Sequence, residues 1–162
     1  MSPWTLRRKA ARVVLLDPSG RVFLMHALDP GDPSKPPWWE LPGGGIDHGE
    51  TSEQAARREL VEETGITGAE IGPCIWEQHV EFDFGGLHFD QDERIHVAWC
   101  EGGEYAPTHL EALEAAAFRG GRWWTVPELV DTQTRTLPPR LGELLPAIVA
   151  GELPHTPLDI GA

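Results

Sequence analysis

The chain has 162 residues, of which 40% are hydrophobic and 24% are charged, as in an ordinary soluble globular protein. Its formal net charge of −13 argues against a partner that is a nucleic-acid polymer, because such binding needs a basic face, and equally against an anionic membrane surface. Length and composition predict one domain, with a core over about residues 10–150 and a tail over 151–162.

The sequence carries no sign of secretion or of membrane insertion. Residues 1–8 lack the apolar segment of a signal peptide, and no apolar run is long enough to span a bilayer. Cys74 and Cys100 lie far apart in apolar stretches, which predicts free buried thiols and no zinc site. A reducing, cytoplasmic location fits these features.

Two apolar runs, residues 11–16 and 21–27, predict a β-hairpin around a turn at residues 17–20. Arg12 belongs to the densest basic cluster of the chain, residues 7–12. That cluster is usually a solvated start that aids solubility. The functional alternative is that Arg12, on a strand leading into a site, binds a substrate phosphate as a bidentate donor.

Residues 29–37 contain four prolines and no periodicity, which predicts a loop of restricted flexibility. Two tryptophans follow directly. Paired tryptophans more often pack than stack on a nucleobase, and Trp39 is expected in the core. Trp38 is expected to be the more exposed of the two and is a candidate for substrate contact.

A helix is expected after residue 51, with clear signals at both ends. Thr51 is a plausible N-cap, Gln54 completes a capping box, and Gly65 fits a left-handed C-cap. Between these ends, apolar residues recur at helical spacing and give the helix one buried side.

Three glutamates of this helix, Glu59, Glu62 and Glu63, stand at i, i+3 and i+4, so their side chains converge. A solvated acidic face is the commoner explanation for such a run. Here, however, the helix directly follows a glycine turn at residues 42–45, which brings bare backbone close to its start. Converging hard oxygen ligands suit Mg²⁺ or Mn²⁺, so the cluster predicts a metal site.

A long hairpin is expected from residues 75–84 and 87–100 around the turn Gly85-Gly86. Pairing the residues on either side of this turn predicts one apolar face, which comprises Val80, Phe82, Phe84, Leu87 and Phe89. The opposite face carries acidic and histidine side chains. It could hold a second metal, but the solvent side of an antiparallel hairpin is the favoured interpretation.

The remaining segments predict an alanine-rich helix over 110–118, a closing strand over 122–126 and a final helix over 137–150. From residue 151 onward, prolines and sparse apolar residues suggest an extended tail.

Around the acidic helix, the fixed positions resemble the Nudix box. These positions are Gly44, then Glu50 after five residues, then after seven more Arg58-Glu59-Leu60, Glu62-Glu63 and Gly65-Ile66. The flanking residues 39–44 and 124–129 also resemble this family, so the likeness spans roughly residues 11–129. It implies an α/β/α sandwich with a mixed sheet between helices, and Mg²⁺-dependent hydrolysis of a phosphoanhydride in a nucleoside diphosphate derivative.

The resemblance also implies roles for individual residues. Glu59, Glu62 and Glu63 would hold the metal together with the Gly43 carbonyl, and Arg58 would connect the loop to the helix by ion pairing. In this family a further acid often completes the metal site or serves as the base. Glu114 is the first choice for it and Glu111 the second, and the general base stays open between Glu59 and that downstream acid.

In related sequences, certain residues outside the box correlate loosely with the class of substrate, and this chain lacks the usual marker residues. Glu81 stands where ADP-ribose hydrolases have proline, and Phe82 and Phe84 stand near the position where dinucleoside polyphosphate hydrolases have tyrosine. A nucleoside triphosphate or a nucleotide sugar remains, with slight preference for the former, and a homodimer is left open. Two alternatives are a non-catalytic nucleotide-binding domain, which would have damaged box glutamates, and an isoprenoid diphosphate isomerase, which needs a cysteine at the metal.

Overall fold

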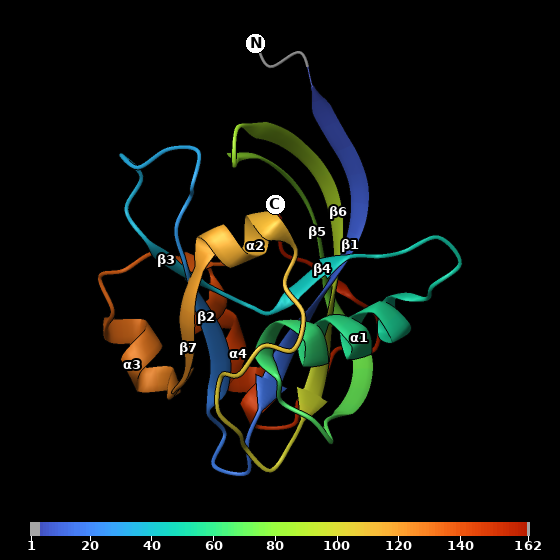
Figure 1. Cartoon of the computed structure of the whole chain (residues 1–162). Helices are drawn as coiled ribbons and strands as arrows, with labels where there is room; N and C mark the ends of the chain where they lie inside the picture. Colours follow the sequence, from blue (N-terminus) through green and yellow to red (C-terminus); the bar gives the residue numbers. More distant parts are fainter. Residues whose placement is uncertain (1–3, 162) are drawn as a thin grey trace.

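The computed structural model describes residues 4–161 and contains one mixed sheet with helices on both of its faces (Figure 1). The strands are β1 (Thr5–Leu16), β2 (Val22–Ala27), β3 (Trp38–Glu40), β4 (Gly43–Gly45), β5 (Glu70–Phe84), β6 (Leu87–Trp99), β7 (Phe118–Trp124), β8 (Thr136–Leu137) and β9 (Leu158–Asp159). The helices are α1 (Ser52–Thr64), α2 (Ala112–Ala117), α3 (Val126–Asp131) and α4 (Leu141–Val149).

The sheet has the order β8-β3-β2-β1-β6-β5-β9, with β4 paired to β1 and β7 to β2. Its mixed character comes from three parallel pairs, β1 with β6, β3 with β8 and β5 with β9, while the hairpins pair antiparallel. The central pair is long, because β1 runs beside β6 from Thr5↔His88 to Leu16↔Trp99. This central pair supports β4 and α1, which carry most of the site.

Alternation along β1 divides the core into two layers. Val13 and Leu15 pack with α1 residues such as Leu60, whereas Val14 packs with α4 residues such as Leu145. In Figure 1, α1 accordingly lies in front of the strands and α4 behind them. The expected α/β/α sandwich with a mixed sheet is confirmed.

The sequence predicted most elements but not all of their ends. The turn Gly85-Gly86 and the pairing Phe84↔Leu87 are confirmed. The expected helix over 137–150 begins only at Leu141, because the chain before it, Thr136–Leu137, pairs with β3 as the strand β8.

The segment after residue 150, expected as an extended tail, is attached to the sheet. The strand β9 pairs with β5, and the Ile160 N–H donates to the Glu77 carbonyl at 3.0 Å. The Ile160 side chain is buried in the α4 layer of the core. The end of the chain therefore contributes to packing, which its composition did not indicate.

Cys100 is buried, Cys74 is half-buried, and both are free thiols, as expected. Among the residues described, no helix combines the length and apolar character that crossing a bilayer requires.

Candidate active site

Hydrogen bonds at both ends fix the helix α1. The Thr51 hydroxyl accepts from the Gln54 N–H at 3.1 Å, and the Gln54 side chain accepts from the Thr51 N–H at 2.9 Å, so the capping box is present. At the other end Gly65 has φ 76°, and a Cβ there would lie 1.8 Å from the Ala106 carbonyl oxygen. Only glycine fits this position. The helix is thereby held in place against both the sheet and the loop at residue 106.

The strand β4, made of three glycines, passes between β1 and α1. A Cβ on Gly43 would lie 2.2 Å from the Ala11 carbonyl oxygen, and a Cβ on Gly44 would lie 2.6 Å from the Glu59 carboxyl carbon. The backbone of β4 can therefore contact β1 on one side and the Glu59 carboxylate of α1 on the other only because it carries no side chains.

Three carboxylates converge beside β4: Glu59, Glu63 and Glu114, here called the carboxylate cluster. One oxygen of each lies within 4.8 Å of the others. Glu59 is 9% exposed and Glu63 is 1% exposed, and the Gly43 N–H donates to Glu63 Oε2 at 2.7 Å. Glu114 comes from α2, whose first turn it occupies. The downstream acid that the sequence ranked first thus lies beside two of the expected ligands.

The cluster is electrostatically unfavourable without a cation. Burial raises the pKa of Glu63 well above its ordinary value, and the neighbouring Glu114 and Glu59 raise it further. Burial also raises the pKa of Glu59, although Arg58 acts in the opposite direction. Buried like charges are costly unless they are paired or bind a metal. Hard oxygen donors in this arrangement match a divalent cation of the Mg²⁺ or Mn²⁺ type.

Arg58 connects the glycine loop to α1, as the resemblance implied. It donates to both oxygens of Glu50 at 2.8 and 2.9 Å, and to the Gly45 carbonyl at 3.0 Å. Its Nη1 also contacts Glu59 at 2.8 Å and Glu62 at 3.2 Å. Glu62 is therefore bound to Arg58 and lies outside the group of three oxygens, although it lines the same pocket.

Because Arg58 hydrogen-bonds Glu50, it lowers the pKa of Glu50 to about 2. A depressed carboxyl pKa adds stability above the unfolded-state value and loses it as the pH falls through the folded-state value. We expect the free energy of unfolding to fall between about pH 4.5 and pH 2 partly for this reason. In Glu50→Gln this contribution should be missing, so urea unfolding at pH 6 and pH 3 should show a smaller difference than in the wild type. An unchanged difference would contradict the assignment.

The three residues of the carboxylate cluster line a pocket of about 720 Å³. The same pocket is lined by the apolar face of the β5–β6 hairpin, here called the apolar wall, which consists of Val80, Phe82, Phe84, Leu87 and Phe89. Within it, the rings of Phe82 and Phe89 stack at 5.0 Å between centroids. The sequence predicted that these side chains share a face, but not that this face would line a pocket.

Arg12 lines the pocket as part of a buried polar network. Its Nε donates to Glu93 at 2.9 Å, and its Nη1 donates to Glu40 at 3.0 Å and to the Leu41 carbonyl at 3.1 Å. Two carboxylates thus neutralise this guanidinium.

Arg8, which the sequence analysis did not single out, also lines the pocket. It donates to Gln91 at 2.6 Å and lies 5.0 Å from the Phe89 ring centroid. Within residues 4–161 it forms no ion pair with a carboxylate, so its charge is more available than that of Arg12.

The expected exposure of the two tryptophans is wrong. Trp38 is only 8% exposed, because its indole N–H donates to the half-buried Glu40 carboxylate at 3.0 Å and its ring meets Phe84 edge-on. Trp39 is half-buried and packs against Trp124. Trp38 nevertheless lines the pocket, so it remains a candidate for substrate contact.

The other candidates are not brought into the carboxylate cluster. Glu111 caps α2 and its side chain is exposed. On the outer face of the hairpin, His79, Glu81 and Asp90 come close together but the first two are exposed, as expected for a solvent side. Cys74 and Cys100 are not among the described residues that line the pocket, so no thiol lies where an isomerase would need one.

Comparisons with known proteins identify the family and the fold of the chain. The family model of the NUDIX domain matches residues 6–148. A protein of Caulobacter vibrioides named RNA pyrophosphohydrolase is 36% identical over 129 residues, which is 73% of each chain. Another of that name from Novosphingobium aromaticivorans is 34% identical over 140 residues, covering 76% of this chain and 81% of its own.

Solved structures share the fold. A MutT NUDIX hydrolase from Burkholderia pseudomallei matches with a TM-score of 0.55 at 22% identity, covering 85% of this chain and 95% of the other. The MutT protein from Methanosarcina mazei Go1 matches with a TM-score of 0.60 at 16% identity, covering 89% and 96%.

Proposed function

The chain belongs to the Nudix family of pyrophosphohydrolases, and from that premise we propose that it hydrolyses a phosphoanhydride bond of a small nucleoside triphosphate with Mg²⁺ as cofactor. One observation carries the proposal. Three carboxylates from α1 and α2 converge in a pocket that the apolar wall also lines. The carboxylate cluster suits a metal and phosphates, and the apolar wall suits a flat nucleobase.

The chemistry must overcome the charge of the substrate. A divalent cation held by Glu59, Glu63 and Glu114 would neutralise phosphate oxygens and lower the pKa of the attacking water. Water attacks one phosphorus, the anhydride P–O bond breaks, and the leaving phosphate takes the electron pair. The proton of the water goes to a carboxylate. Glu59 and Glu114 are our candidates for that base.

Arg58, Glu62 and the Gly43 carbonyl have supporting roles in this proposal. Arg58 limits the rotamers of Glu59 by a 2.8 Å contact and fixes the glycine loop through Gly45. Glu62, bound to the same guanidinium, can complete the metal environment through water. The Gly43 carbonyl is a further candidate ligand, because the Gly43 N–H donates to Glu63 and so places this residue beside the carboxylate cluster.

The arginine side chains that line the pocket can neutralise the negative charge of the substrate phosphates. Arg8 extends from the apolar wall toward the glycine loop, since a Cβ on Gly45 would lie 3.3 Å from its Nη1. For a phosphate that lies between the nucleobase and the carboxylate cluster, the Arg8 guanidinium is the first candidate contact. Arg12, held by Glu40 and Glu93, is the second candidate.

A second candidate substrate is the 5′-triphosphate end of an RNA chain, because several relatives are named RNA pyrophosphohydrolase. The reacting group would be the same. Net charge of −13 weighs against a long polyanion, so we keep the free nucleotide, or a nucleotide sugar, as the principal proposal. Intact box glutamates disfavour a non-catalytic domain, and the two distant thiols disfavour an isomerase.

The proposal is tested with purified protein, Mg²⁺ and ¹⁸O-labelled water. Nucleoside triphosphates, nucleotide sugars and a short 5′-triphosphate RNA are incubated separately, and mass spectrometry identifies the products and the labelled phosphate. We expect Mg²⁺-dependent turnover of a free triphosphate, with kcat/KM above that for the RNA. Faster turnover of the RNA would replace the principal proposal by the second candidate, and no turnover of any compound would overturn both.

A further inference from the structure

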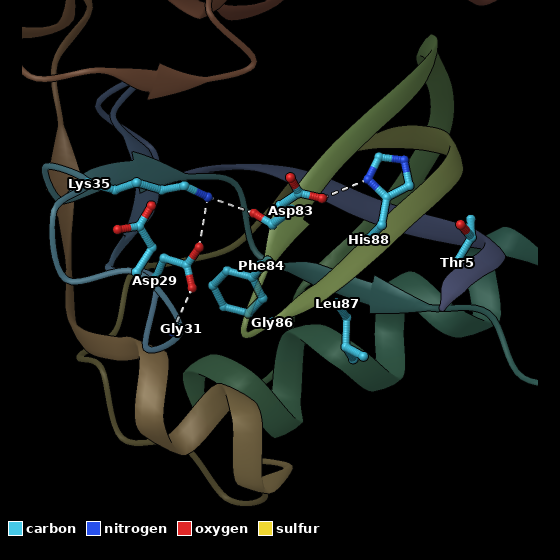
Figure 2. A pocket seen from close by; sticks show the side chains of 10 residues that line it. Thr5, Asp29, Gly31, Lys35, Asp83, Phe84, Gly86, Leu87 and His88 are labelled. Carbon is cyan, nitrogen blue, oxygen red and sulfur yellow. Dashed lines mark hydrogen bonds and ion pairs between the residues drawn. The ribbon is translucent and has the colours of Figure 1, made fainter. Parts of the chain in front are cut away.

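Asp29 is a buried carboxylate that lies outside the carboxylate cluster and joins two distant segments. Its Oδ1 accepts from the N–H groups of Gly31 and Gly85, both at 2.8 Å, and its Oδ2 accepts from the Lys35 ammonium at 2.7 Å. Figure 2 shows Asp29 facing Lys35 next to Phe84 and the β5–β6 turn. The proline-rich loop over residues 28–37 is thus connected to the tip of the hairpin.

Other contacts strengthen the same connection. Lys35 also donates to the Asp83 carbonyl at 2.8 Å. A Cβ on Gly31 would lie 2.6 Å from the Gly86 nitrogen, so loop and turn are in direct backbone contact. Burial would raise the pKa of Asp29, but Lys35 and the two N–H donors outweigh it and hold that pKa below its ordinary value.

The segment that Asp29 holds forms one side of the pocket. The apolar wall belongs to the part of β5 and β6 nearest the turn, and Trp38 at the end of the loop meets Phe84 edge-on at 6.2 Å. On the other side of the turn, a Cβ on Gly85 would lie 2.4 Å from Leu113 of α2, the neighbour of Glu114. The turn therefore lies between the Asp29 loop and the helix that carries Glu114.

We propose that Asp29 is a positioning residue for substrate binding, which holds the apolar wall at its distance from the carboxylate cluster by joining the 28–37 loop to the Gly85-Gly86 turn. The inference rests on the proposed function, since it assigns the wall to the base-bearing end of the substrate. Loss of the connection leaves α1 and its glutamates untouched but lets the wall move, so substrate affinity falls more than turnover.

The chain offers a matched control in Asp17. This carboxylate is buried to the same degree and also accepts three hydrogen bonds, from the N–H groups of Ser19 and Arg21 and from the Arg21 guanidinium. It lies in the β1–β2 turn and is not among the described pocket-lining residues. Asp17→Asn therefore loosens a turn without loosening the wall.

The test compares Asp29→Asn, Asp17→Asn and wild type in KM, kcat and the hydrogen exchange of amides at residues 80–89. In Asp29→Asn we expect KM to rise about tenfold with kcat changed less than about threefold, and amides 80–89 to exchange faster. In Asp17→Asn, KM and those amides should stay at wild-type values even if the free energy of unfolding falls equally. Equal KM and equal exchange in the two variants would overturn the proposal. Hydrogen exchange needs no substrate, so it tests the role of Asp29 even if the wild type turns over none of the nucleotides offered. Such a lack of turnover would contradict the proposed function and not the role of Asp29 in holding the wall.

Discussion

Glu63→Gln is expected to lower kcat by about 10³-fold while the fold persists. The side chain is 1% exposed, and glutamine matches its size and can still accept the Gly43 N–H. What disappears is one negative charge from the carboxylate cluster, and with it a ligand for the cation. Steady-state kinetics at saturating Mg²⁺ measure the loss. Glu62→Gln should also lower kcat by orders of magnitude, because Glu62 completes the metal environment in the proposed mechanism.

The control for this variant is Glu53→Gln, on the exposed side of the same helix, where the carboxylate pairs with Arg57 at 3.3 Å and is not part of the carboxylate cluster. Its kcat should equal that of the wild type. Near-normal turnover in Glu63→Gln would show that the acidic side of α1 is only a solvated face.

The same substitution should change the pH dependence of stability in the metal-free protein. Because the pKa of Glu63 is raised by burial, the folded state keeps a proton that the unfolded state has released, and the free energy of unfolding falls as the pH rises above about 4.5. Glu63→Gln should remove this fall, so the variant should be the more stable protein at pH 8. Chemical unfolding in EDTA at pH 5 and pH 8 tests the sign.

Gly44→Ala is expected to lower kcat by about 10²-fold with little loss of stability. The new methyl group would lie 2.6 to 2.8 Å from the carboxyl atoms of Glu59, which must move away from Glu63 and Glu114. Crystallography of the variant should show Glu59 in another rotamer, and kinetics should show the lower turnover.

The neighbouring Gly45→Ala is the matched control. Its methyl group would meet only the flexible end of Arg8, at 3.3 Å, so the carboxylate cluster should stay intact. Equal losses of kcat in the two variants would mean that the glycine loop is merely intolerant of side chains.

The acidic helix could be predicted from sequence because its signals are local. Thr51, Gln54 and Gly65 mark its ends within one short segment, and each of them makes the expected cap. The position of Glu114 was harder to predict, because 51 residues separate it from Glu63. Only the path of the chain through β5, β6 and α2 brings Glu114 beside Glu63. Family resemblance suggested the neighbourhood, and the structure distinguishes it from Glu111.

The pocket lining depended on contacts that no local pattern contains. Period-two alternation assigned the apolar wall to one face of the hairpin, but whether that face meets the core or a pocket depends on how β1 and β6 curve. Glu40 and Glu93, which neutralise Arg12, are 28 and 81 residues away from it in sequence. Trp38 is buried because its ring meets Phe84, 46 residues away, and its indole N–H donates to Glu40, which Arg12 binds.

Binding of Mn²⁺ in the absence of substrate, followed by electron paramagnetic resonance, tests the central claim most directly. If the carboxylate cluster exists to hold a divalent cation, the wild type should bind Mn²⁺ at a site that Mg²⁺ displaces, and Glu63→Gln and Glu114→Gln should each weaken it while Glu53→Gln does not. Equal Mn²⁺ binding by all four proteins would contradict the account.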